Sequence, residues 1–148
     1  MKKILGLVFL MLILVSATNI TSSKSHASPS MEGTWELVNR YNYDGINVSD
    51  TLLNINGYRQ VKIYSKNTVM WTRYAPDDPK EWYGYGTYTS TDNSLSEKLE
   101  YGSKAMMKVL DTVQTFKFEL HLEDNFYSQI TMDEHGHPTF SENYKRID

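Results

Sequence analysis

Apolar residues alternate with polar residues along most of this chain from Gly33 onward, and this period of two restricts its fold more than any other feature. Short turn sequences rich in Asn, Asp, Gly, Pro and Ser separate the alternating runs. A period of two places every second side chain on one face of a β-strand, whereas a helix needs a period near 3.6. Several such runs joined by turns predict an all-β domain.

The alternation predicts eight strands, most of them joined by tight turns. They span residues 34–41, 58–64, 68–74, 81–90, 94–101, 112–122, 126–132 and 139–147. Two connections are longer: residues 42–57 include Ser49, a possible cap of a helical turn, and residues 102–111 have a weakly helical apolar pattern. Closure removes both edges of a sheet of eight up-and-down strands. The predicted fold is therefore an all-β, eight-stranded antiparallel up-and-down barrel.

The N-terminus has the pattern of a signal peptide. Two lysines precede residues 4–17, an aliphatic run that is shorter than the roughly 20 residues of a membrane-spanning helix. Cleavage after Ala17 or after Ala27 fits the small-x-small rule, and the second leaves a short tail before the first strand. We therefore predict a signal peptide at 1–27 and a mature domain at 28–148, secreted or held in the periplasm or cell envelope.

Composition argues against several classes of protein. The chain has no cysteine, so disulfides, thiolate metal sites and a lipidated cysteine anchor are excluded. Removal of residues 1–27 takes away three lysines and no acidic residue, which changes the formal net charge from −3 to −6. This sign argues against nucleic acid or an anionic membrane as a partner. We expect a monomer without a cofactor and without an integral membrane segment after signal cleavage.

The same alternation assigns side chains to the barrel interior. Charged residues prefer water, so Lys62 is expected outside, which places Arg59, Val61 and Ile63 inside. In the later strands the expected inward residues are Gly84, Gly86, Tyr88, Leu95, Glu97, Leu99, Tyr101, Phe116, Phe118, Leu120, Leu122, Glu142, Tyr144 and Arg146.

Two of these inward residues, Glu97 and Glu142, are carboxylates. A buried carboxylate is destabilising unless it is paired or hydrogen-bonded, so both need partners, for which Arg59, Arg146 and the inward tyrosines are candidates. The two glutamates could belong to a purely structural ion-pair network. Alternatively, they could be polar anchors in an otherwise apolar pocket, which is the usual composition of a small-molecule site.

Both ends of the domain resemble the lipocalins. Gly33-Thr34-Trp35 opens the first predicted strand, and Arg146 lies in the last. In lipocalins the tryptophan of a Gly-x-Trp motif plugs one end of the barrel and a late arginine packs across its ring, so the resemblance implies a cation–π contact between Trp35 and Arg146. Further segments resemble short exported bacterial lipocalin-like domains, and this similarity covers residues 31–148. The segments are residues 62–64, 70–74, 84–88 and 142–146.

The residues and the resemblance together predict an exported lipocalin-like protein that binds a small apolar or amphipathic ligand inside its barrel. Trp35 and Arg146 are expected to close one end, and residues 42–57 to form a lid. The chain lacks the cysteines and the late helix of larger lipocalins, so no particular ligand is implied. The candidate ligand-binding residues are Tyr88, Glu97, Tyr101, Phe118, Glu142 and Tyr144.

Two other functions remain open at this point. A barrel isomerase or hydrolase would use Glu97 and Glu142 as general acid and base. A protein-interaction module would have a barrel filled by its own side chains. His135 and His137 lie in an acidic turn, but zinc normally takes three or four protein ligands, so a solvated turn is expected there and no metal site is predicted.

Overall fold

The computed structural model describes residues 29–148, and the signal peptide predicted at 1–27 lies outside them. The described chain forms nine strands and one helix. They are β1 (Gly33–Tyr43), β2 (Val48–Leu53), β3 (Arg59–Ser65), β4 (Thr68–Tyr74), β5 (Trp82–Ser90), β6 (Ser94–Gly102), α2 (Lys104–Leu110), β7 (Thr115–Leu122), β8 (Phe126–Met132) and β9 (Pro138–Arg146). Within this range, no helix has the length and apolar character needed to span a bilayer.

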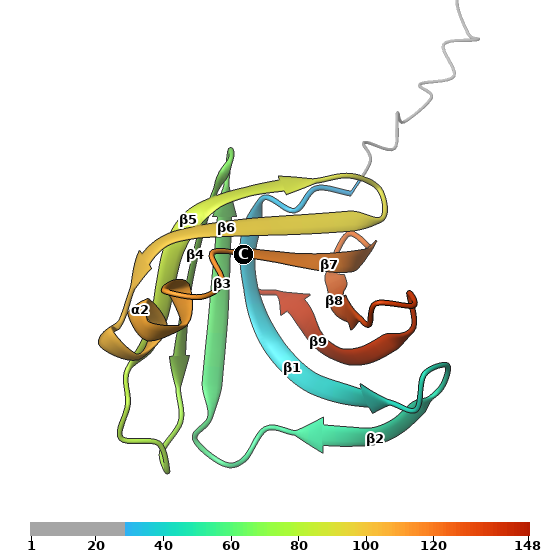
Figure 1. Ribbon diagram of the computed structural model, residues 1–148, viewed down its shortest axis with the longest axis horizontal. Helices are drawn as coiled ribbons and strands as arrows, with labels where there is room; N and C mark the ends of the chain where they lie inside the picture. Colours follow the sequence, from blue (N-terminus) through green and yellow to red (C-terminus); the bar gives the residue numbers. More distant parts are fainter. Residues whose placement is uncertain (1–28) are drawn as a thin grey trace, which may run out of the picture.

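All nine strands belong to one antiparallel sheet. Its order is β2-β1-β3-β4-β5-β6-β7-β8-β9, and β1 also pairs with β9. The sheet therefore returns on itself, and the strands follow one another around a ring (Figure 1). The prediction of an all-β domain with mostly consecutive antiparallel strands is confirmed, whereas the predicted number of eight strands is wrong.

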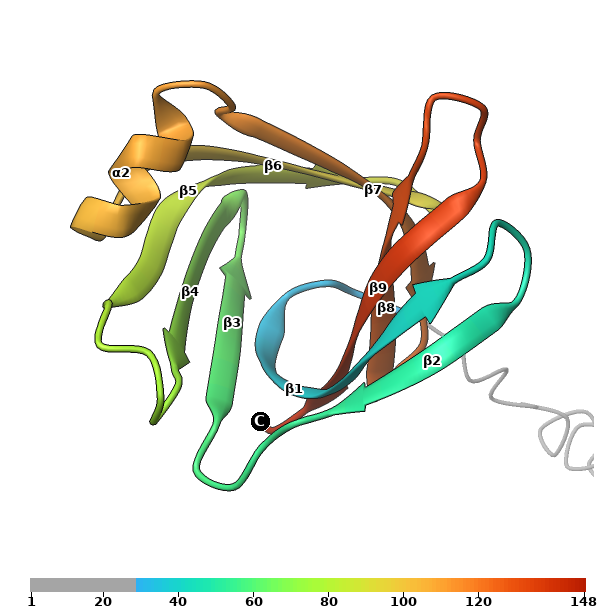
Figure 2. The same cartoon turned by 60° about the horizontal axis from the view of Figure 1, so that its bottom comes forward.

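The additional strand is β2, which lies in the long connection where Ser49 is a possible cap of a helical turn in the sequence. β1 is long enough to hold two neighbours on one side: its residues 33–36 pair with β3, and its residues 39–43 pair with β2. The second half of β1 would otherwise lack backbone partners on that side, and β2 supplies them. Figure 2 shows β2 beside the end of β1 at the margin of the ring.

The weakly helical pattern of residues 102–111 is confirmed as α2. Ser103 caps the helix by accepting a hydrogen bond from the Met106 amide at 3.2 Å. Met106 and Leu110 are buried, and the helix packs against β5 and β6 at one end of the ring (Figure 2). β7 begins at Thr115, three residues later than predicted.

Trp35 is fully buried in the interior of the ring. The guanidinium of Arg146 lies over its ring at 4.1 Å, which confirms the expected cation–π contact. Arg146 also donates to the backbone carbonyls of Ser30, Glu32 and Asp124 at 2.7–2.8 Å. These bonds tie two separate segments, residues 30–32 and the turn between β7 and β8, to the last strand.

Aromatic side chains fill the interior next to Trp35. Tyr127 meets Trp35 edge-on at a centroid distance of 4.9 Å and stacks on Tyr144 at 4.7 Å. Tyr64 contacts Tyr88 edge-on at 4.8 Å. Such pairs add to the stabilisation from apolar burial. This half of the interior is therefore a packed core.

The inward assignment of β3 is wrong. Lys62 is 4% exposed, whereas Ile63 is 42% exposed and Arg59 is also exposed. Lys62 lies directly opposite Trp35 in the β1–β3 register, and directly opposed residues share a face of the sheet. Burial of Trp35 therefore places Lys62 in the interior as well.

Tyr101 is the second exception to the predicted faces. Gly86 pairs with Leu99 but Tyr85 pairs with Tyr101, so β6 has one extra residue at this point. A β-bulge of this kind reverses the alternation beyond it. Tyr101 is consequently 54% exposed and packs against Tyr85 at 5.3 Å on the outer face.

Candidate functional site

The half of the interior next to α2 contains a pocket of about 150 Å³ that is open to solvent on one side. We call it the interior pocket. Its lining comes from five strands and the helix: Gln60, Lys62, Trp71, Arg73, Glu97, Leu99, Met106, Phe116, Phe118 and Glu142. Four other hollows, of about 310–540 Å³, are larger. Of these five hollows, the interior pocket alone is lined by a buried ion pair.

Strand register explains how these residues meet. Lys62 on β3 lies opposite Trp71 on β4, and Gln60 lies opposite Arg73. Trp71 is in turn opposite Gly84 on β5, and a Cβ atom at Gly84 would lie 2.8 Å from the Trp71 indole nitrogen. The absence of a side chain at Gly84 therefore gives the indole its place in the wall of the pocket.

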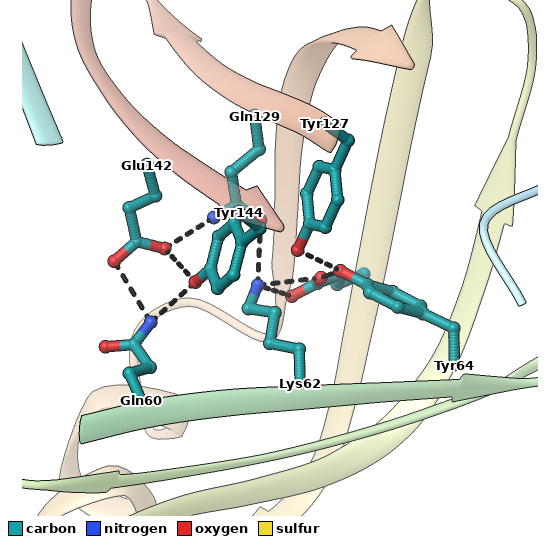
Figure 3. A network of polar contacts seen from close by, with 8 residues as sticks. Gln60, Lys62, Tyr64, Tyr127, Gln129, Glu142 and Tyr144 are labelled. Carbon is teal, nitrogen blue, oxygen red and sulfur yellow. Dashed lines mark hydrogen bonds and ion pairs between the residues drawn. The ribbon is translucent and has the colours of Figure 1, made fainter. Parts of the chain in front are cut away.

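One side of the pocket is a buried ion pair between Lys62 and Glu97. The Lys62 ammonium donates to both carboxylate oxygens at 2.9 and 3.2 Å and to Oε1 of Gln129 at 2.8 Å. The Tyr64 hydroxyl donates to the same carboxylate, and Tyr127 lies 3.4 Å from that hydroxyl (Figure 3). Lys62 and Glu97 are 4% and 2% exposed, so each relies on the other for neutralisation.

Glu142 lies at the centre of a second group of hydrogen bonds. Gln60 donates to Oε1 at 3.2 Å, and Gln129 and Tyr144 donate to Oε2 at 2.8 and 2.7 Å. Gln60 also donates to the Tyr144 hydroxyl at 2.6 Å. Figure 3 shows Gln129 between this group and Lys62, so the two groups form one network.

The tyrosines of the network are held in their neutral form. Burial raises the pKa of Tyr64, Tyr127 and Tyr144 well above the ordinary tyrosine value, and the nearby carboxylates add to the effect. Burial also raises the pKa of Tyr58, which donates to Gln60 at 2.8 Å. The hydroxyls of Tyr64 and Tyr144 therefore donate to the carboxylates, and the hydroxyl of Tyr58 donates to Gln60.

The predicted ligand-binding residues lie at four different places. Glu97, Phe118 and Glu142 line the interior pocket. Tyr144 is buried and supports Glu142 from below the pocket surface, without lining it. Tyr88 lies in the packed core and faces a hollow at the other end of the ring. Tyr101 lies on the outer face, away from the pocket.

Lys62, Gln60, Trp71 and Met106 are pocket residues that the sequence analysis missed. The predicted burial of Glu97 contained a signal for one of them, because a buried carboxylate needs a cation and the strand lysines can supply one. The signal does not single out Lys62, since Lys98 and Lys117 also lie near the middle of predicted strands. Neither of the arginines proposed as its partner fills that role. Arg59 pairs with Glu36 on the outside at 2.8 Å, and Arg146 covers Trp35.

The two glutamates share the pocket but are separated by Lys62 and Gln129 in the network. The arrangement therefore differs from a pair of carboxylates in direct contact. Among residues 29–148, no group of three or more His, Cys, Asp or Glu side chains is placed to hold a metal ion. His137 lies 3.4 Å from Asp133 in its turn.

The fold and the pocket together define an all-β protein whose single antiparallel sheet returns on itself around a partly charged cavity. A solved structure of an uncharacterised protein from Bacteroides eggerthii is similar to it, with a TM-score of 0.52 and 13% sequence identity. The match covers 80% of this chain and 100% of that one. At this identity the likeness concerns the fold alone. No protein-family model and no curated protein matches the chain.

Proposed function

We propose that this protein binds a small amphipathic molecule in the interior pocket of a lipocalin-like barrel. The observation that carries the proposal is the division of the interior: aromatic side chains fill the half next to Trp35, whereas the half next to α2 contains about 150 Å³ of unfilled space. A cavity of about this volume holds a benzene-sized molecule. An interior filled entirely by its own side chains would have no such space.

The chemistry of the lining supports an amphipathic ligand. Trp71, Leu99, Met106, Phe116 and Phe118 provide apolar contacts on the walls. The polar floor of the pocket, which we define as Gln60, Lys62, Glu97 and Glu142, is held in place by the hydrogen-bond network. Small-molecule sites typically combine a mostly apolar lining with a few fixed polar groups.

The finer architecture belongs to the same proposal. The pairing of β1 with β9 and the contact of Arg146 with Trp35 support a barrel that is closed at one end, as in lipocalins. In this interpretation β2 is an addition to eight barrel strands, and export follows from the N-terminal sequence pattern. The protein would act as a monomeric carrier outside the cytoplasm.

The proposal can be tested by filling the pocket from α2. Met106 is buried and lines the pocket, whereas its neighbour Met107 is 41% exposed on the same helix. We would measure the binding of benzyl alcohol by saturation-transfer NMR to the unmodified protein, to Met106→Trp and to Met107→Trp.

The expected result is that Met106→Trp abolishes binding and that Met107→Trp leaves it unchanged, because only the first indole occupies the pocket. Thermal unfolding of both variants establishes that they are folded. Binding that survives in a folded Met106→Trp variant, or no binding to the unmodified protein at millimolar ligand, would contradict the proposed function.

A further inference from the structure

All hydrogen bonds that Glu142 accepts come from uncharged groups. The donors are the side-chain amides of Gln60 and Gln129 and the hydroxyl of Tyr144. No lysine or arginine within residues 29–148 forms an ion pair with this carboxylate. Partly buried carboxylates are stabilised most strongly by a cationic partner. Glu142 thus faces the interior pocket without a direct counter-ion.

Lys62 is the nearest cation of the polar floor, and its charge is already matched by Glu97. Its three N–H groups are directed at the two oxygens of Glu97 and at Gln129. The polar floor therefore contains one ammonium and two carboxylates, a formal charge of −1, and Arg73 is the one other charged residue of the lining. This excess of negative charge lies on the side of Glu142.

The two arginines nearest the pocket are engaged elsewhere. Arg73, at the rim, lies over the Trp82 ring at 4.6 Å and 3.8 Å from Asp78. Arg40 is opposite the carboxylate in the β1–β9 register, but it donates to Asn54 at 2.9 Å. The Nε atom of each arginine is buried and has no hydrogen-bond partner among residues 29–148. The alternative to a cationic ligand is therefore an anionic ligand that binds to Arg73, and a binding test must distinguish the two.

The hydrogen-bonding capacity that remains at the polar floor consists of acceptors. Both N–H groups of Gln60 and all those of Lys62 are used within the network. A carboxylate oxygen can accept about two hydrogen bonds, and Oε1 of Glu142 and Oε2 of Glu97 each accept one. A ligand that contacts the floor must therefore supply donors.

The walls suit a cation as well as an apolar body. Trp71, Phe116 and Phe118 line the pocket together with the two glutamates. The faces of aromatic rings attract cations, and tryptophan does so most strongly. A group that combines positive charge with several N–H donors satisfies both the walls and the floor.

From these observations we infer that the ligand of the interior pocket has an ammonium group, directed at Glu142, on an apolar body about the size of a benzene ring. The inference rests on the proposed function and adds the chemical class of the ligand. The ammonium would take the remaining acceptor positions of the floor and neutralise its net charge. The apolar body would lie between the aromatic side chains.

Three probes that share one ring and differ in their head groups test the inference. Benzylamine is an ammonium at neutral pH, benzyl alcohol is uncharged and benzoate is an anion. We would measure their affinities by isothermal titration calorimetry at low salt. Benzylamine is expected to bind at least tenfold tighter than benzyl alcohol, roughly the strength of one charge-assisted hydrogen bond, and benzoate to bind the weakest.

Tighter binding of benzoate, or equal binding of benzylamine and benzyl alcohol, would overturn the ammonium inference and leave the binding function intact. No binding of any of the three would instead contradict the proposed function. The two failures are therefore distinguishable in one experiment.

Two variants locate the effect. Glu142→Gln retains the size of the side chain, and it is expected to reduce the preference for benzylamine over benzyl alcohol to less than about threefold, because the charge is lost. Arg73→Gln removes a cation from the rim without touching the polar floor. It is expected to raise benzylamine affinity several-fold, because the Arg73 guanidinium and the ligand ammonium repel each other in a pocket that is only partly exposed to water. A preference unchanged in folded Glu142→Gln, or a benzylamine affinity that falls in Arg73→Gln, would overturn the inference.

Discussion

Lys62 and Glu97 form an ion pair in the interior of the ring, with nitrogen–oxygen distances of 2.9 and 3.2 Å. Lys62→Met leaves the carboxylate buried without its cation, so the free energy of unfolding should fall by about 3–5 kcal/mol. Urea unfolding measures the change.

Arg59 on the same strand provides a matched control. It pairs with Glu36 at 2.8 Å, but its side chain is 63% exposed. Arg59→Met should therefore lower the free energy of unfolding by less than about 1 kcal/mol. Equal losses in the two variants would show that the buried pair has no special role in stability.

Gly33 is required by the contact between Trp35 and Arg146. Its φ of +140° is unfavourable for other residues, and a Cβ atom there would collide with the Arg146 guanidinium. Gly33→Ala should lower the free energy of unfolding by more than about 2 kcal/mol, since strain and displacement of the arginine combine.

Gly45 separates these two causes. It also has a positive φ, +103°, but a Cβ atom there would have no neighbour within 4 Å. Gly45→Ala should therefore show the strain alone, on the order of 1 kcal/mol. A loss for Gly33→Ala that is no larger than that for Gly45→Ala, measured by urea unfolding, would contradict the role given to Arg146.

The buried tyrosines predict a loss of stability at alkaline pH. Burial raises the pKa of Tyr64, Tyr127 and Tyr144 in the folded state, so the unfolded chain loses these protons first as the pH rises. The stabilisation is complete below the unfolded tyrosine pKa of about 10 and decreases as the pH rises from there toward the folded values.

Each of the three groups contributes up to about 1.4 kcal/mol per pH unit in this range. Urea unfolding from neutral to strongly alkaline pH measures the slope, and tyrosinate absorbance of the folded protein reports which tyrosines ionise. A variant with Tyr64→Phe should show a shallower slope. Complete ionisation of all tyrosines near pH 10 without unfolding would contradict the buried network.

Phe118 and Tyr101 were both predicted to bind ligand, but the structure places only Phe118 in the interior pocket. Phe118→Ala should weaken benzyl alcohol binding by about 1–2 kcal/mol through lost apolar contact. Tyr101→Ala should leave it unchanged. Saturation-transfer NMR with a competition series measures the benzyl alcohol affinity of the two variants. A larger loss of affinity in Tyr101→Ala than in Phe118→Ala would place the binding site on the outer face.

The sequence predicted the regular parts of the sheet well. The faces of β5 and β7 are as expected, with Gly84, Gly86 and Leu120 buried. In these strands each polar residue has a solvent-facing position, so polarity and face agree. The contact between Trp35 and Arg146 was also predictable, because its residues are distinctive and lie at the two ends of the domain.

The errors arose where long-range contacts overrule local pattern. Lys62 looks like a surface residue until Glu97, from another strand, is placed beside it. The bulge before Tyr101 is defined by how β6 pairs with β5. The alternation of apolar and polar residues within β6 alone does not reveal it. β2 has little alternation of its own and exists because β1 offers backbone partners. The sequence therefore placed the two carboxylates and Leu99, Phe116 and Phe118 inside correctly, but it missed two polar and two apolar residues of the pocket, namely Gln60, Lys62, Trp71 and Met106.

The central claim, that the interior next to α2 is a ligand site, is tested most directly by mapping amide chemical shifts of the isotope-labelled protein during titration with benzyl alcohol. The account predicts saturable shifts confined to the strands and helix around the interior pocket, with Leu99, Met106 and Phe116 among the largest. Shifts confined to the outer faces of the sheet, or no saturable shift at all, would contradict it.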